Sequence, residues 1–134
     1  MKVYTACLYL LLLVALSGCN AYHPADRQTD EHPLIYPSYE AVTFPCNIAP
    51  PNFRICTEGE QYQSEFGVEG EEPAFHVTST KPTVNIPPKQ WRKLTEQGAG
   101  KSIYFRITIR QAGEWVRYAD LTNRISEHPI DPYL

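Results

Sequence analysis

The most reactive side chains of this sequence are its cysteines, four in 134 residues. Cys46 and Cys56 lie among short predicted strands, and their spacing would allow a disulfide to close a hairpin. Such a closed loop would contribute about 2–3 kcal/mol in the chain-entropy account. Two separate buried thiols and a pair of metal ligands are the alternatives. Nothing nearby completes a zinc site, because His32 and His76 are remote and follow no ligand spacing.

No motif of a known catalytic type occurs in the sequence, which lacks a nucleophile elbow, HExxH, a phosphate-binding loop and CxxCH. The four histidines share no motif spacing: His23, His32, His76 and His128. His76 falls in a predicted strand, and we interpret it as an ordinary sheet histidine. The acidic loop 69–72 lacks the Asp/Asn alternation of a calcium loop and is interpreted as a solvated turn. We therefore expect no enzyme activity, no metal and no cofactor.

Cys19 stands at the end of a segment typical of a secretion signal. Lys2 precedes an apolar run, 3–16, that is too short for a comfortable membrane span and indicates a signal peptide over residues 1–18. The tetrapeptide Leu16-Ser17-Gly18-Cys19 resembles the lipobox of bacterial lipoproteins. In a lipobox the cysteine thiol forms a thioether to a lipid, and the cysteine becomes the first residue of the mature chain. An ordinary signal peptide with an incidental cysteine is the alternative.

Acylation at Cys19 would place the chain in the cell envelope. Each buried methylene contributes about 0.8 kcal/mol, so two or three acyl chains, palmitate among them, hold a protein stably on a membrane. Asn20 stands where an aspartate would retain an enteric lipoprotein at the inner membrane, which favours the outer membrane without fixing the leaflet. The net charge is −3 and becomes one unit more negative when Lys2 is removed. An acidic chain lacks the basic surface that nucleic acid requires.

The rest of the chain divides into a linker and a domain. Residues 19–37 are polar, proline-punctuated and aperiodic, which predicts a flexible tether that lifts the domain off the membrane. Residues 38–134 have the length of one small domain and alternate short β-type runs with Gly and Pro. The predicted strands are 39–44, 52–57, 61–68, 74–80, 83–86, 101–111 and 115–122. A helix is expected over 89–97, ending at Gly98. This pattern predicts an immunoglobulin-like β-sandwich with one short helix.

The predicted strand 101–111 separates its side chains onto two faces. One face is apolar, with Ile103, Phe105, Ile107 and Ile109. The other face carries our candidate docking residues, which are Tyr104, Arg106 and Arg110, extended by Arg117 on the next strand. Arginines interleaved with an aromatic ring can stack on sugars or pack against a protein. An ordinary exposed sheet face is the alternative.

The two tryptophans allow two interpretations. Trp91 and Leu94 share one helix face and are expected to pack on the core. Trp115 and Tyr118 are also expected in the core. Exposed tryptophans would instead indicate a glycan-binding platform.

The most distinctive stretch of the chain is IYPSYEAVTFPCNIAPPNFRI, residues 35–55. It resembles the N-terminal region of large lipoproteins of Gram-negative gut anaerobes, the TolB-like or WD40-like β-propeller (PD40) proteins. Their pattern is similar to IYPDY-x-x-VTIP-x-NIAPLNF. Ser38 and Pro51 depart from it, where aspartate and leucine are commoner. The resemblance continues through 86–120 to HPIDPYL at 128–134, and so covers nearly the whole mature chain. The positions that match in the first stretch are Tyr36, Pro37, Tyr39, Val42, Thr43, Pro45, Asn47, Ile48, Ala49, Pro50, Asn52 and Phe53.

The resemblance also implies how the apolar end, Pro132–Leu134, is to be understood. In those relatives DPYL is followed by a connector, a Cys-x-x-Cys-His segment of the type that attaches c-type haem, and propeller repeats. None of these follows here, so the resemblance transfers no haem, redox role or propeller ligand. It implies an interruption, whether a truncated gene, a split gene or a fragment. A shorter, self-sufficient variant is the alternative.

Together these expectations describe a non-enzymatic lipoprotein whose β-sandwich, 38–134, is the spacer and docking module of a TolB-like propeller protein. The expected partners are the membrane, through the lipid on Cys19, and a protein or a glycan. A stand-alone glycan-binding or adhesin-like surface lipoprotein is the alternative, and exposure of Trp91 and Trp115 discriminates between the two. An electron-transfer or enzyme subunit would rest only on the absent downstream region.

Overall fold

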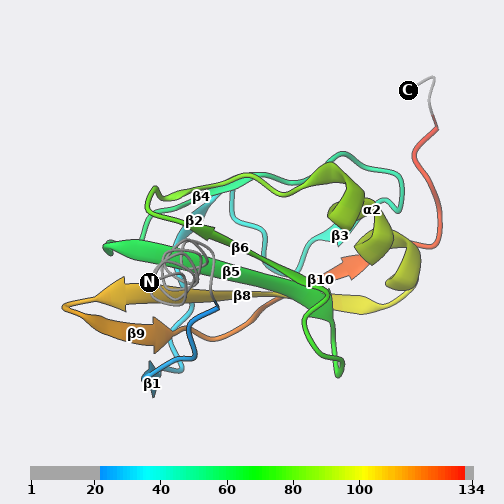
Figure 1. Cartoon of the computed structure of the whole chain (residues 1–134). Coiled ribbons are helices and arrows are strands. Elements are labelled where there is room, and N and C mark those ends of the chain that lie inside the picture. Colours follow the sequence, from blue (N-terminus) through cyan, green and yellow to red (C-terminus); the bar gives the residue numbers. More distant parts are fainter. Residues whose placement is uncertain (1–21, 132–134) are drawn as a thin grey trace, which may run out of the picture.

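The computed structural model describes residues 22–131, which form a mostly β structure with one short helix and two sheets (Figure 1). The signal-peptide segment, Cys19 and Pro132–Leu134 lie outside the described residues. Within residues 22–131, no helix has the length and apolarity needed to cross a bilayer. The elements are β1 (Arg27–Gln28), β2 (Ile35–Tyr36), β3 (Thr43–Phe44), β4 (Phe53–Ile55), β5 (Gln61–Val68), β6 (Phe75–Ser79), β7 (Thr83–Val84), α2 (Pro88–Gln97), β8 (Ser102–Gln111), β9 (Glu114–Arg117) and β10 (Leu121–Ile125).

The seven-stranded sheet is built around β8, the longest strand. On one side β8 pairs antiparallel with β5, from Gln61 opposite Arg110 to Val68 opposite Ile103, and β6 pairs with the far edge of β5. On its other side β8 pairs with β9 along its C-terminal half and with β10 along its N-terminal half. The short strands β1 and β3 then add in parallel to β9 and β10. Figure 1 shows the long β5–β8 pair crossing the middle of the molecule.

The predicted hairpin after β8 is confirmed, but its second strand is divided. Ala112 and Gly113 both have positive φ, 50° and 77°, as a two-residue type I′ turn requires. The predicted strand 115–122 is interrupted between β9 and β10. The interruption arises because the backbone N–H of Ala119 turns away from β8 and donates to the carbonyl of Glu31.

A single core joins the two sheets and the helix. The second sheet has the strand order β2-β4-β7, and Phe53 of β4 packs on Phe66 and Phe105 of the first sheet, with ring centroids 6.4 and 5.8 Å apart. The predicted helix is confirmed. Trp91 is 2% exposed, and its indole Nε1–H donates to the carbonyl of Ile48 at 3.1 Å. The expectation that Trp91 packs on the core is therefore confirmed.

The N-terminal part of the domain differs from the sequence expectation. The predicted strand 39–44 contributes only β3, because Ala41 has a φ of 56° and its N–H donates to Thr122 instead. The expected linker, 19–37, contains β1 and β2, which pair with β9 and β4. Its polar composition did not indicate these strands, because the partners that satisfy its backbone lie far away in the sequence.

Candidate functional site

The face of the seven-stranded sheet opposite the core carries a continuous group of polar and aromatic side chains. We call it the outer face. The strand register brings His76, Glu65 and Arg106 into one row across β6, β5 and β8. The side chains of the outer face include Gln61, Gln63, Glu65, His76, Thr78, Tyr104, Arg106, Thr108, Arg110, Trp115 and Arg117.

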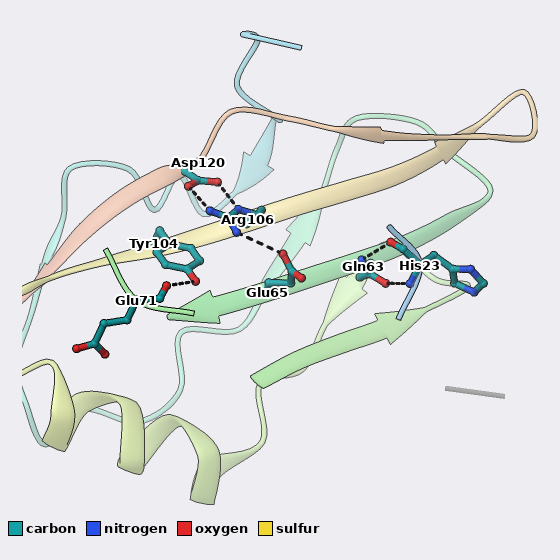
Figure 2. Close-up of polar contacts among 7 residues, drawn as sticks. All are labelled: His23, Gln63, Glu65, Glu71, Tyr104, Arg106 and Asp120. Carbon is teal, nitrogen blue, oxygen red and sulfur yellow. Dashed lines mark hydrogen bonds and ion pairs between the residues drawn. The ribbon is translucent and has the colours of Figure 1, made fainter. Parts of the chain in front are cut away.

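Arg106 forms the charged centre of the outer face (Figure 2). Its guanidinium donates to both carboxylate oxygens of Asp120, at 2.9 Å from Nε and 3.0 Å from Nη2. The nearer oxygen of Glu65 lies 3.8 Å from Nη1. The hydrogen bond to Asp120 is the main cause that raises the pKa of Arg106, so the guanidinium stays charged. One guanidinium thus forms a bidentate pair with Asp120 and a longer ion pair with Glu65 inside the chain.

Tyr104 lies beneath this ion cluster. The guanidinium carbon of Arg106 sits 4.6 Å from the centroid of its ring, a cation–π contact. The phenol donates to the carbonyl of Glu71 at 3.0 Å, and the residue is only 4% exposed. Burial raises the pKa of the Tyr104 phenol. Gly67 leaves the space that the Tyr104 side chain occupies, because a Cβ at position 67 would lie 2.5 Å from the Tyr104 phenol oxygen.

The start of the described chain crosses the outer face. The backbone N–H of His23 donates to Oε1 of Gln63, and Nε2 of Gln63 donates to the His23 carbonyl, at 2.9 and 3.0 Å (Figure 2). The His23 ring stacks on Trp115, with centroids 4.9 Å apart and planes 9° apart. Gln63 and Thr108 are only 1% and 3% exposed although they do not face the core. The N-terminal segment therefore acts as their cover.

Neighbouring residues extend this cover on both sides of His23. The Tyr22 ring packs edge-on against His76, with centroids 6.1 Å apart. Burial, followed by the charge and hydrogen bonding of Glu65, raises the pKa of the Tyr22 phenol. Asp26 reaches the sheet edge, where its N–H donates to the Trp115 carbonyl and its carboxylate accepts from the Trp115 N–H. The segment 22–28 thus runs from β6 across the face to β9.

The four candidate docking residues do not form one open surface. Tyr104 and Arg106 are in contact, but the first is buried and the second has its donors bound to Asp120 and Glu65. Arg110 lies near the turn, with Nε 3.7 Å from a carboxylate oxygen of Glu60. Arg117 lies opposite Thr108 and is half-buried. Arg110 and Arg117 are the two candidates with side chains that a partner can reach.

The cysteines of the candidate disulfide are free thiols in the structure. Cys46 follows β3, and its thiol lies 3.8 Å from the carbonyl oxygen of Glu127. Cys56 follows β4, is exposed, and has its thiol 4.0 Å from the carbonyl oxygen of Arg54. Between residues 22 and 131, no three His, Cys, Asp or Glu side chains are grouped so that they could hold a metal ion.

Neither tryptophan is an open aromatic platform. Trp91 is in the core, whereas Trp115 is 9% exposed and lies on the outer face beneath His23. Tyr118 is in the core, as expected. The most exposed large aromatic side chain of the described part is Tyr36, 74% exposed, which borders a depression of about 410 Å³ beside Arg54 and Tyr62.

The comparisons with known proteins give no family. No protein-family model matches the sequence, and no curated protein is significantly similar to it.

The sequence analysis missed most of the partners in this site. Glu65 and Gln63 carried a signal, since polar residues alternate with Tyr62, Phe66 and Val68 along β5. Asp120 and His23 gave no comparable signal. Both reach the outer face only through the path of the chain, the first from the break after β9 and the second from the expected linker.

Proposed function

We propose that this protein is a non-enzymatic lipoprotein, anchored in the cell envelope by acylation of Cys19, and that its β module serves as the spacer and docking module of a TolB-like propeller protein. The observation that carries the proposal is the lipobox, which precedes a β module whose central guanidinium is paired within the chain. Arg106 binds Asp120 and forms a longer ion pair with Glu65, an arrangement that stabilises a fold rather than poises a reactive group.

The course of the chain supports a spacer. Its first described residues lie on the outer face, whereas its last ones lie beyond α2 and β10 at the other end of the molecule (Figure 1). The exit is fixed at Ile130, whose N–H donates to Asn47 at 2.7 Å and whose carbonyl accepts from the Asn47 amide at 3.2 Å. A module that follows the DPYL residues would therefore start from a defined point, away from the anchor.

We also propose that the two sheets form an immunoglobulin-like β-sandwich. An immunoglobulin-like sandwich would place two sheets face to face around one core. The packing of Phe53 against Phe66 and Phe105 across the two sheets supports it. The docking role falls to Arg110 and Arg117, because the polar groups of Tyr104 and Arg106 already have partners within the chain. The buried state of Trp91 and Trp115 weighs against the glycan-platform alternative.

Substitution of the lipobox cysteine tests the anchor. We predict that Cys19→Ala, expressed as the full chain in a Gram-negative host, moves the protein from the membrane fraction to the soluble fraction, because no acyl chain can then be attached. Fractionation with mass analysis of the N-terminal peptide is the measurement. Cys56→Ala is the matched control, since it removes an exposed thiol elsewhere and should leave the protein in the membrane fraction. Membrane attachment of Cys19→Ala would contradict the proposal.

A further inference from the structure

The first hydrogen-bonded residue of the described chain lies very close in sequence to the proposed lipid anchor. Three residues lie between Cys19 and His23, and the four residue-to-residue steps of a fully extended chain span at most about 14 Å. Any arrangement of the intervening residues keeps the anchor within this distance of His23. A lipid on Cys19 therefore cannot be far from the outer face.

The position of His23 on that face is well determined. Its N–H and carbonyl both bond the Gln63 side chain, which is 1% exposed, and its ring stacks on Trp115. Behind it, Asp26 exchanges hydrogen bonds with Trp115, and β1 pairs with β9. The segment therefore holds the chain on the sheet at several points, and a flexible tether of residues 19–37 would not.

We propose that the outer face around Tyr22, His23 and Trp115 rests on the phospholipid headgroup layer that holds the Cys19 lipid. This inference rests on the proposed function, because it requires acylation of Cys19. It adds an orientation to that function: the sheet lies on the bilayer at its β5–β6–β9 side, and the helix side faces away.

The side chains at this position suit a headgroup layer. Tyr22 is 51% exposed, and rings with a polar group are favoured at the interface between lipid and water. Arg110 and Arg117 have long apolar stems and charged ends that can reach phosphates. The guanidinium of Arg106 is already paired with Asp120 inside the chain, so it brings no unpaired cation to this face. Because the chain as a whole is acidic, the anchor rather than the net charge must hold the face in place.

The two tryptophans of the chain are fluorescent probes that can report this orientation. Trp115 pairs with Arg110 on the outer face, whereas Trp91 packs against Phe105 on the core face, with ring centroids 6.4 Å apart. When the outer face rests on the bilayer, β8 lies along the membrane surface, so the depths of the two indoles differ by the distance across the sheet, on the order of 10 Å. The proposal places Trp115 near the lipid and Trp91 well away from it.

Fluorescence quenching by spin-labelled lipid tests the proposal. The acylated full chain is reconstituted in phosphatidylcholine vesicles with and without a phosphatidylcholine that carries a nitroxide on its headgroup. We expect the nitroxide lipid to quench the fluorescence of Trp115 more strongly than that of Trp91. The variant Trp91→Phe reports on Trp115, and Trp115→Phe reports on Trp91. If Trp91→Phe does not fold, Trp115→Phe compared with the unchanged chain still gives the two contributions. Equal quenching, or stronger quenching of Trp91, would overturn the orientation.

Release of the N-terminal segment provides the second readout. Gln63→Ala removes both hydrogen bonds to His23 and leaves only the ring contacts of Tyr22 and His23. The first hydrogen-bonded residue becomes Asp26, and once those ring contacts open the reach from Cys19 grows to about 25 Å. The quenching of Trp115 should then fall toward the value for Trp91. Gln61→Ala is the matched control, because Gln61 occupies the same face of β5 one pleat away, and it should leave the quenching unchanged.

The outcomes separate this proposal from the one on which it rests. A chain that carries no lipid on Cys19 overturns the proposed function and the orientation with it. An acylated chain that floats with the vesicles, but whose two tryptophans are quenched alike, overturns the orientation alone. Strong quenching of Trp115 that Gln63→Ala does not reduce would show that the N-terminal segment does not set the orientation.

Discussion

Tyr104 shows how much a single side chain of this sheet depends on its neighbours. Its ring supports the Arg106 guanidinium, and its hydroxyl bonds a backbone carbonyl in the loop after β5. Opposite it, on β5, Gly67 leaves the space that the ring occupies. Any larger residue at Gly67 would force the ring to move, and the cation–π contact with it.

The Tyr104 phenol should make the stability of the fold sensitive to alkaline pH. Burial raises its pKa in the folded chain above the ordinary value of 10.0, while Arg106 opposes the shift and Glu65, Asp120 and Glu72 add to it. Above pH 10 the unfolded chain loses this proton and the folded chain keeps it, so the free energy of unfolding falls as pH rises. Below that pH the contribution is fully present.

Tyr104→Phe isolates this contribution. At neutral pH the variant should be less stable by about 0.5–1.5 kcal/mol, because it lacks the hydrogen bond to the carbonyl of Glu71. The difference should narrow above pH 10, since the variant has no phenol to titrate at this position. Urea unfolding across this pH range measures both effects. A difference that does not change with pH would contradict the assigned burial.

At the residue scale, the sequence indicated on which face of the sheet a side chain lies, but it did not indicate which side chain it contacts. Period-two alternation placed Tyr104 and Arg106 on the same side of β8, and the structure confirms this. It did not show that Glu65 and Asp120 neutralise Arg106, because a cross-strand partner depends on register. Register is decided by contacts between segments far apart in the chain.

At the scale of elements, the turn between β8 and β9 carries a local conflict. A type I′ turn needs positive φ at both central positions, and the chain places an alanine at the first of them. A left-handed conformation costs an L-residue about 1–2 kcal/mol, and asparagine tolerates it better than alanine. The hairpin therefore forms despite this residue, held by its pairing in the sheet.

We predict that Ala112→Asn stabilises the protein by roughly 0.5–1 kcal/mol, because Asn-Gly is the preferred type I′ pair. Thermal unfolding is the measurement. Gly113→Ala tests the same reason in the opposite direction. A methyl there would touch nothing within 4 Å, so its destabilisation would come from the backbone alone. Equal effects of the two substitutions would contradict the turn assignment.

Long elements were predictable, whereas most two-residue strands were not; β7 is the exception, because it lies within the predicted strand 83–86. The bounds of β5 and the helix agree closely with the sequence prediction because their patterns are self-contained. By contrast, β1, β2 and β3 have two residues each and exist only through their partners β9, β4 and β10. No local pattern of that length distinguishes a strand from a polar loop.

At the scale of the whole molecule, the class of fold followed from the number and texture of the strands, but its topology did not. The sequence predicted a mostly β domain with one helix, which the structure confirms. The parallel additions of β1 and β3 at the edges of one sheet could not be predicted, because β1 comes from the expected linker and the pattern of 39–44 does not indicate which strand β3 joins. The same segments decide how the N-terminal end of the chain meets the domain.

The N-terminal segment has a mechanical consequence for a protein held by its end. Tension applied at Cys19 would load the His23–Gln63 bonds first and the contacts of β1 next, so that the segment peels away one step at a time. Peeling from His23 as far as Thr29 frees seven residues, with an extended length of about 25 Å. We predict a short, low-force extension of that size before the core unfolds, measurable by single-molecule pulling from residue 19. If this extension step disappears in Gln63→Ala, the N-terminal segment is what holds the domain against the membrane. Under load, its release would let the domain move away from the membrane surface.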